Sequence, residues 1–243
     1  MEMSTEIWWA LGLAAGLAGM VQGVTGFGFG MVAMAAWTPV IGPKNANLLV
    51  TPLAGVTILV ALWQVRREVD WRRALPLGIG GLLGTPVGVF ILFHSDPILL
   101  RRLIGGGIIV AAMTSLRGVC PADKPAWPGW ALAAGMLGGV MAGVVAMAGP
   151  PAVVYTYRQP WALPRIKATL LCYFALTVGY RLALFIGSGA YTPWLTHSMA
   201  FLVPLAALAT WTGSRLSEHL PRRLIEWIVA GLLILAGLGL LLK

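Results

Sequence analysis

Residues 23–30 read Gly-Val-Thr-Gly-Phe-Gly-Phe-Gly (GVTGFGFG) and interrupt an apolar segment that extends from about residue 7 to residue 41. A membrane-crossing helix needs about 20 apolar residues, so this segment is too long for one helix. Each arm beside the break has about 16 residues, or about 24 Å of helix, which falls short of a tilted crossing. The fold therefore depends on whether the chain crosses the membrane at this break or turns back there.

The rest of the chain divides into similar apolar segments. A second overlong segment, 127–157, is interrupted at Ala148–Pro151 (AGPP). Six further segments fit a membrane helix each: 45–65, 74–93, 98–117, 165–186, 194–213 and 222–242. All eleven Trp lie near proposed segment ends, as in an aromatic interface belt.

The composition agrees with these segments. Of the 243 residues, 58% are hydrophobic and 10% are charged, whereas soluble domains average about 45–50% and about 25%. The 31 Gly and 16 Pro would break soluble helices, but membrane helices tolerate them. We predict an all-α integral membrane protein.

The two halves of the chain resemble each other. When the chain is aligned with itself at an offset of 121 residues, Arg101-Arg102-Leu103-Ile104 aligns with the identical sequence Arg222-Arg223-Leu224-Ile225. At an offset of 120, Gly19 and Gly23 meet Gly139 and Gly143. We predict one transmembrane domain, 1–243, made of a first repeat, 1–120, and a second repeat, 121–243. Each repeat would be a broken or re-entrant helical hairpin followed by three transmembrane helices.

The distribution of basic residues distinguishes hairpins from broken crossing helices. If both interrupted segments are hairpins, the repeats are inverted, and one face holds Lys44, Arg101, Arg102 and Lys243. The opposite face then collects Arg66, Arg67, Arg72, Arg73, Arg117, Lys124, Arg158, Arg165, Lys167, Arg215, Arg222 and Arg223. Broken crossing helices would divide the same residues almost evenly. Because cytoplasmic loops are enriched in Lys and Arg, we predict inverted repeats in the inner cell membrane with both termini outside.

Three features together resemble a known family. The first is the break GVTGFGFG followed by Pro39, the second is GGLLGTPVG at residues 80–88, and the third is the duplicated half with its own break. They are similar to the TauE/SafE family of sulfite exporters and anion permeases, although AGPP is less Gly-rich than the family pattern. The resemblance implies transport of sulfite, sulfonates or related organosulfur anions.

The breaks are the predicted anion sites. Helix N-termini offer unpaired N–H groups and positive potential without a fixed charge, and inverted-repeat transporters place their sites at such breaks. The alternative is that the glycines only permit close helix packing. The predicted substrate contacts at the two breaks are Gln22, Thr25, Gly26, Phe27, Gly28, Phe29, Gly30, Gly149, Pro150 and Ala152.

Other candidates lie on the helices. Three residues at matching depths in the helices after the hairpins could line the path of the anion through the membrane, or could pack in the core: Thr51, Cys172 and Tyr173. Arg181 is the only charge well inside an apolar segment, where ionisable residues are usually functional; the alternative is that it snorkels to the interface. The glycines at 80, 84 and 88 are interpreted as a helix-packing face.

The predicted function is permeation of a small anion, driven outward by the membrane potential. No Asp or Glu lies mid-membrane to relay protons. Two alternatives stay open: proton-coupled uptake of a small organic anion, and a non-transporting assembly factor. We expect no enzyme activity, catalytic residue, metal or cofactor, since the histidines form no HExxH pair. The expected partners are the anion and the lipid bilayer, and no nucleic acid; homo-oligomerisation stays open.

Overall fold

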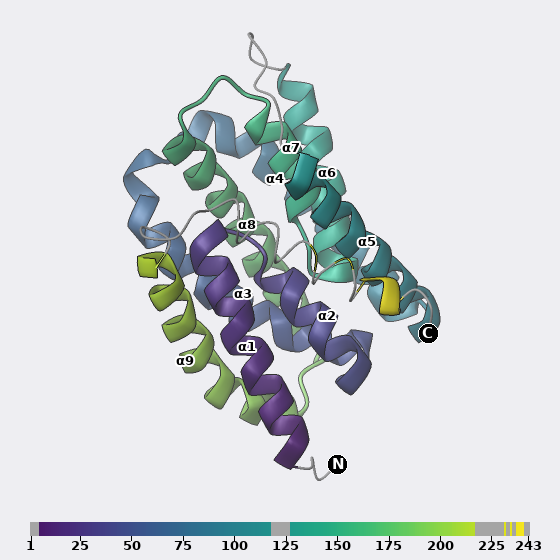
Figure 1. Cartoon of the computed structure of the whole chain (residues 1–243). Coiled ribbons are helices and arrows are strands. Elements are labelled where there is room, and N and C mark those ends of the chain that lie inside the picture. The colour runs from purple at the N-terminus through teal and green to yellow at the C-terminus, as the bar shows by residue number, and fades with distance from the viewer. Residues whose placement is uncertain (1–4, 118–126, 217–230, 232–233, 235–236, 241–243) are drawn as a thin grey trace.

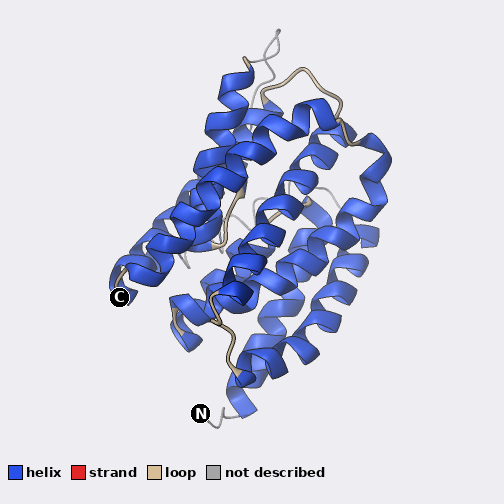
Figure 2. Cartoon of the chain, turned by 180° about the vertical axis from the view of Figure 1, so that it is seen from behind, coloured by secondary structure: helices blue, strands red, loops and turns tan. Residues whose placement is uncertain are grey.

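The computed structural model of the chain describes residues 5–117, 127–216, 231, 234 and 237–240. Within these ranges every regular element is helical (Figure 2). The first half contains α1 (Thr5–Thr25), α2 (Phe29–Ile41), α3 (Pro43–Val65), the short 3-10 helix η1 (Arg66–Glu68), α4 (Trp71–His94) and α5 (Pro97–Arg117). The second half contains α6 (Pro128–Val145), α7 (Gly149–Tyr157), α8 (Leu163–Gly187) and α9 (Pro193–Leu216).

Five predicted segments, from 45–65 to 194–213, are thus confirmed as helices. The sixth, 222–242, and the predicted repeat boundary near residue 120 lie largely or wholly outside the described residues. Five described helices are long and apolar enough to cross a membrane: α1 from Ile7, α3 with η1, α4, α8 and α9. Their outer faces expose large apolar side chains such as those of Leu59, Leu83 and Phe201. The chain is an all-α integral membrane protein.

The first interrupted segment is a helical hairpin. Helix α1 continues through Gly23 to Thr25, and α2 begins at Phe29, so the break is shorter than the quoted motif. Gly26 and Gly28 have φ angles of 83° and 120°, which glycine adopts without the steric penalty that a Cβ would bring. The two helices pack against each other, and Figure 1 shows α2 returning toward the end at which α1 began.

The second interrupted segment also breaks, but not at AGPP as predicted. Helix α6 ends at Val145 and α7 begins at Gly149, so the turn consists of residues 146–148. Pro150 and Pro151 lie in the first turn of α7, where a proline needs no N–H and its fixed φ suits the helix. Ala146 has a φ of 58° and is the non-glycine residue with positive φ in the described chain.

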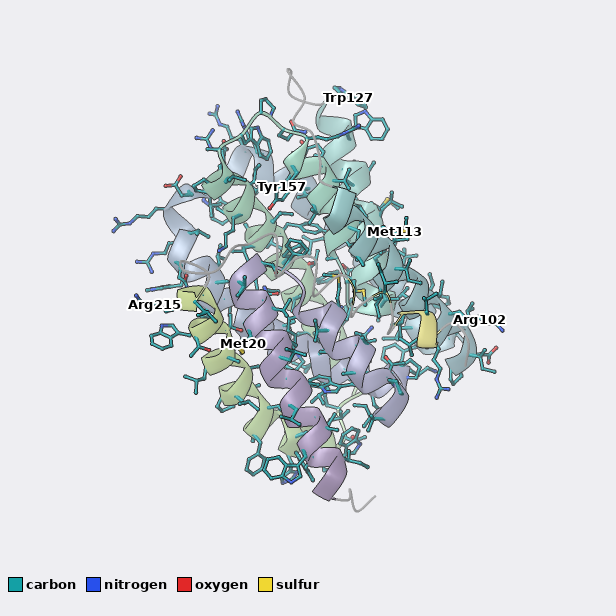
Figure 3. All side chains as sticks on the ribbon, viewed as in Figure 1. Met20, Arg102, Met113, Trp127, Tyr157 and Arg215 are labelled. Atoms are coloured by element: carbon teal, nitrogen blue, oxygen red, sulfur yellow. The ribbon has the colours of Figure 1, made fainter. Side chains whose placement is uncertain are left out.

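The hairpins open toward opposite ends of the molecule. In Figure 1, α1 begins and α2 ends toward the lower right. In Figure 3, Trp127 before α6 and Tyr157 at the end of α7 both lie at the top. Packing is reciprocal between the halves: α1 packs on α9 as α6 packs on α4, and α3 contacts α9 as α8 contacts α4. These facts support the inverted-repeat architecture, which stays a prediction.

Glycines bring α4 and α6 into backbone contact. A Cβ built on Gly80, Gly84 or Gly88 would lie within 2.2 Å of a carbonyl oxygen of α6, and at Gly84 the distance to Met136 O is 2.0 Å. Gly135 and Gly139 of α6 face the backbone of α4 in the same way. The interpretation of the glycines at 80, 84 and 88 as a packing face is confirmed.

Candidate functional site

The two helix breaks meet at one small cavity. It has a volume of about 60 Å³, and residues of both breaks line it together with side chains from α3, α5 and α8. This is enough space for a small ion or a few water molecules. Seven of the predicted substrate contacts line this cavity: Gln22, Phe27, Gly28, Phe29, Gly30, Gly149 and Pro150.

Glycine allows the two breaks to touch. A Cβ on Gly30 would lie 2.2 Å from the carbonyl oxygen of Ala146, so the start of α2 rests directly on the backbone of the second break. Gly149, by contrast, has open space around the position of its missing Cβ. Non-helical backbone at membrane depth is tolerated where protein buries it or where it lines a polar cavity. Gly26 and residues 146–148 meet the first condition, because they are buried.

Gln22 holds the first break in shape. Its buried amide donates from Nε2 to Gly26 O at 3.2 Å and accepts the Phe29 N–H at Oε1 at 3.1 Å. Thr25 Oγ1 donates to Val21 O at 2.8 Å. Gln22 and Thr25 therefore bond to the backbone of their own hairpin, although Gln22 also lines the cavity.

Two helix N-termini face the cavity, and neither N-cap residue provides a side-chain cap; Gln22 accepts one first-turn N–H, that of Phe29. Gly28 precedes α2 and Ala148 precedes α7, and neither makes a side-chain capping hydrogen bond. The first-turn N–H groups of a helix lack acceptors within the helix and form its positive end. None of the described lining residues carries a charge. The cavity therefore offers backbone N–H donors and positive potential among otherwise mainly apolar walls, which suits a small anion with an apolar part.

The walls come from residues of α3 and α8 that are not among the predicted substrate contacts. Ala54 and Ile58 contribute from α3, and Phe174 and Val178 from α8. Each pair is four residues apart, and an offset of 120 relates the two pairs. The internal repeat was therefore a signal that could have identified them. Other lining residues that were missed are Met31, Ala111, Ala146, Met147, Ala148 and Val153.

The remaining candidates do not line the cavity. Thr51 Oγ1 donates to Asn47 O at 2.8 Å within its own helix. Tyr173 OH donates to Gly135 O at 3.0 Å, and Cys172 is buried with a free thiol. Ala152 is fully buried in α7. Gly26 packs against the side chain of Lys167, whose Cε would lie 3.2 Å from a Cβ there.

Arg181 is buried and does not snorkel. Its side chain is 1% exposed, and Nη1 donates to the carbonyl oxygen of Ala142 near the C-terminal end of α6. Asn47 Nδ2 donates to the next two carbonyls, Gly143 O at 3.0 Å and Val144 O at 2.9 Å. Two polar side chains thus hold the end of α6 immediately before the second break.

The loop between α8 and α9 packs near this group. Tyr191 OH donates to Leu48 O at 3.2 Å. Burial raises the pKa of Tyr191 to about 12, although the positive charge of Arg181 opposes the rise. The hydroxyl therefore stays a neutral donor at physiological pH. No cluster of three or more His, Cys, Asp or Glu that could hold a metal occurs among the residues that the structure describes.

Comparisons with known proteins agree on one family. The family described as "Sulfite exporter TauE/SafE" matches residues 11–240. A "Probable sulfite/organosulfonate exporter TauE" of Cupriavidus necator is 28% identical over 96% of this chain and 93% of its own length. A "Probable inner membrane transporter protein TsaS" of Comamonas testosteroni is 28% identical over 72% of this chain and 73% of its own length. No solved structure matches the chain.

Proposed function

Because the chain belongs to the TauE/SafE sulfite exporter family, a family of transporters and not of enzymes, we propose that it exports a small organosulfur anion. The anion would bind in the cavity between the two helix breaks. Sulfite and sulfonates share a compact oxyanion head that accepts several hydrogen bonds, and backbone N–H groups at a helix start are suited to it.

One observation carries this proposal: two helix N-termini whose N-cap residues make no side-chain hydrogen bond face the same uncharged cavity. Gly30 and Met31 would donate from the first turn of α2, and Gly149 from that of α7, since Pro150 and Pro151 have no N–H. The apolar walls, Ile58, Phe174 and Val178, would accept the organic part of a sulfonate.

The membrane potential is the proposed driving force. The cavity has no described Asp or Glu that could relay a proton, whereas proton-coupled carriers usually have one on the path. An anion that leaves a cell with a negative interior gains about 2.3 kcal/mol per charge at 100 mV. No coupling ion is then needed for export.

We expect methanesulfonate to move in proteoliposomes in response to an imposed potential of about 100 mV. The anion keeps one negative charge across the pH range used, so its steady-state ratio should reach about 50. Tracer flux with and without valinomycin measures this. Flux that follows a pH gradient and ignores the potential would instead indicate proton-coupled uptake, and no flux would favour an assembly factor.

We further propose that the basic face is cytoplasmic, with both termini outside in the inner membrane. The two loops after α4 and α8 lie close together: the ring of Phe185 packs on Phe93, just before residues 95–96, and on Tyr191 in loop 188–192. Inverted repeats require these two loops to share one face, and parallel repeats would separate them.

Cysteine labelling tests this topology. In a chain with C120S and C172S, we expect S95C and S188C both to react with an impermeant maleimide on intact spheroplasts, and E68C to react only after permeabilisation. The reason is that α4 separates residue 68 from residue 95. Labelling of S95C without S188C would contradict inverted repeats, and labelling of E68C alone would reverse the orientation.

A further inference from the structure

One face of α8 passes both helix breaks. Lys167, Phe174, Val178 and Arg181 are spaced by seven, four and three residues, which at 100° per residue places them on one stripe of the helix. Phe174 and Val178 line the cavity. Along this stripe Lys167 therefore precedes the cavity and Arg181 follows it, each about 10 Å from Phe174 along the helix axis.

Lys167 belongs to the first break. Its side-chain carbons pack against Gly26, with Cε 3.2 Å and Cγ 3.6 Å from the position of a Cβ there. It lies one turn into α8, near the end that carries Arg158 and Arg165. Its aliphatic stem thus covers the first break from the basic side of the protein.

Arg181 lies beside the second break, on the opposite side of the cavity from Lys167. It lies one turn beyond Val178, and its Nη1 donates to Ala142 O, which also accepts the Ala146 N–H at 3.1 Å. Ala146 lines the cavity. Within the described part of the chain, Nε and Nη2 of Arg181 have no acceptor.

The charge of Arg181 also lacks an acidic neighbour there. The described acidic side chains are Glu68, Asp70 and Asp96, which lie at or beyond the ends of the membrane helices, and the salt bridge in that part of the chain joins Asp70 to Arg73. A buried cation without a counter-charge is costly in a membrane. An anion close to it would offset that cost.

We propose that α8 is the conduit for the anion, with Lys167 governing entry from the basic face and Arg181 governing entry from the opposite face. This rests on the proposed function of the cavity. Both are positioning residues that act through the electrostatic potential at the cavity mouths. At about 10 Å and an effective dielectric constant of about 20, one charge changes the affinity for a monovalent anion by about tenfold.

The test measures KM for methanesulfonate from each side, in right-side-out and inside-out membrane vesicles. We expect K167Q to raise KM about tenfold from the basic face and to leave KM from the other face within twofold. R181Q should do the opposite, because glutamine can still donate to Ala142 O but carries no charge. R181K keeps the charge and should restore most of the affinity.

The matched control is R165Q, which removes an exposed charge from the same end of α8 but from outside the stripe. It should shift neither KM by more than twofold. Two results would overturn the proposal that α8 is the conduit. One is that K167Q and R181Q change KM equally from both faces, and the other is that R181Q loses thermal stability while its KM is unchanged. If R181Q does not fold, the KM values of K167Q and R181K from the two faces still test the proposal. Absence of methanesulfonate transport by the unaltered protein would overturn the proposed function itself.

Discussion

Replacing Gly30 with leucine is expected to abolish transport, with a fall of at least about a hundredfold in the initial rate. A Cβ at this position would lie 2.2 Å from Ala146 O. The backbone fixes the positions of both atoms, so no side-chain rotation can relieve the contact. The start of α2 must then move away from the second break. The two helix N-termini would no longer face one cavity, and the donors proposed to hold the anion would separate.

Tracer efflux from proteoliposomes measures this effect, and a thermal melt of the purified variant shows whether it still folds. Gly16→Ala is the matched control, because it changes a glycine in α1 that has open space around its missing Cβ. Alanine in a helix should keep or slightly raise stability there. A Gly30→Leu variant that transports at the wild-type rate would show that the contact between the breaks is not needed.

Replacing Gly84 with leucine is expected to have the largest effect on stability. The new Cβ would lie 2.0 Å from Met136 O and 3.0 Å from Val140 N, so α4 and α6 could not keep their backbone contact. Overpacking of a well-packed interface costs about 3 kcal/mol or more where the new atom meets backbone that cannot rotate away, as it does here. For a chain of this size that cost lowers the melting temperature by about 10 °C.

Size-exclusion chromatography and a thermal melt in detergent check this prediction. Gly179→Leu on α8 is the control, because Gly179 is exposed and has nothing near its missing Cβ. We expect a single sharp peak and an unchanged melting temperature for Gly179→Leu. If Gly84→Leu melts at the same temperature as the control, the close approach of α4 and α6 does not contribute to stability.

The helices and their breaks could be predicted because apolar length and helix-breaking residues are local properties. Segment length alone located α3, α4, α5, α8 and α9, and the glycines at 26 and 28 marked the first turn. The second turn was harder, since Ala146 adopts a positive φ without any sequence signal and Pro150 looks like a break although it starts a helix. In that case the tertiary structure decides the turn.

The candidate cavity could be predicted at its tips but not along its walls. Depth along a helix follows from counting residues, which is why Thr51 and Tyr173 lie near the right level. The direction of a side chain depends on which neighbours the helix packs against, and one residue changes it by 100°. Ala54 and Phe174 face the cavity because α3 and α8 pack on each other and on α9 and α4.

The reciprocal packing of the halves has a consequence for the order of biosynthesis. Helix α6 can pack on α4 soon after it is made, but α1 has to wait for α9, which begins about 170 residues after α1 ends. At about 5–20 residues per second, the first hairpin spends roughly 10 to 30 s in the bilayer without its partner. The first helix is therefore the part of the nascent chain that is most exposed to membrane quality control. In a protein shortened before α9, α1 would never gain α9 as its packing partner.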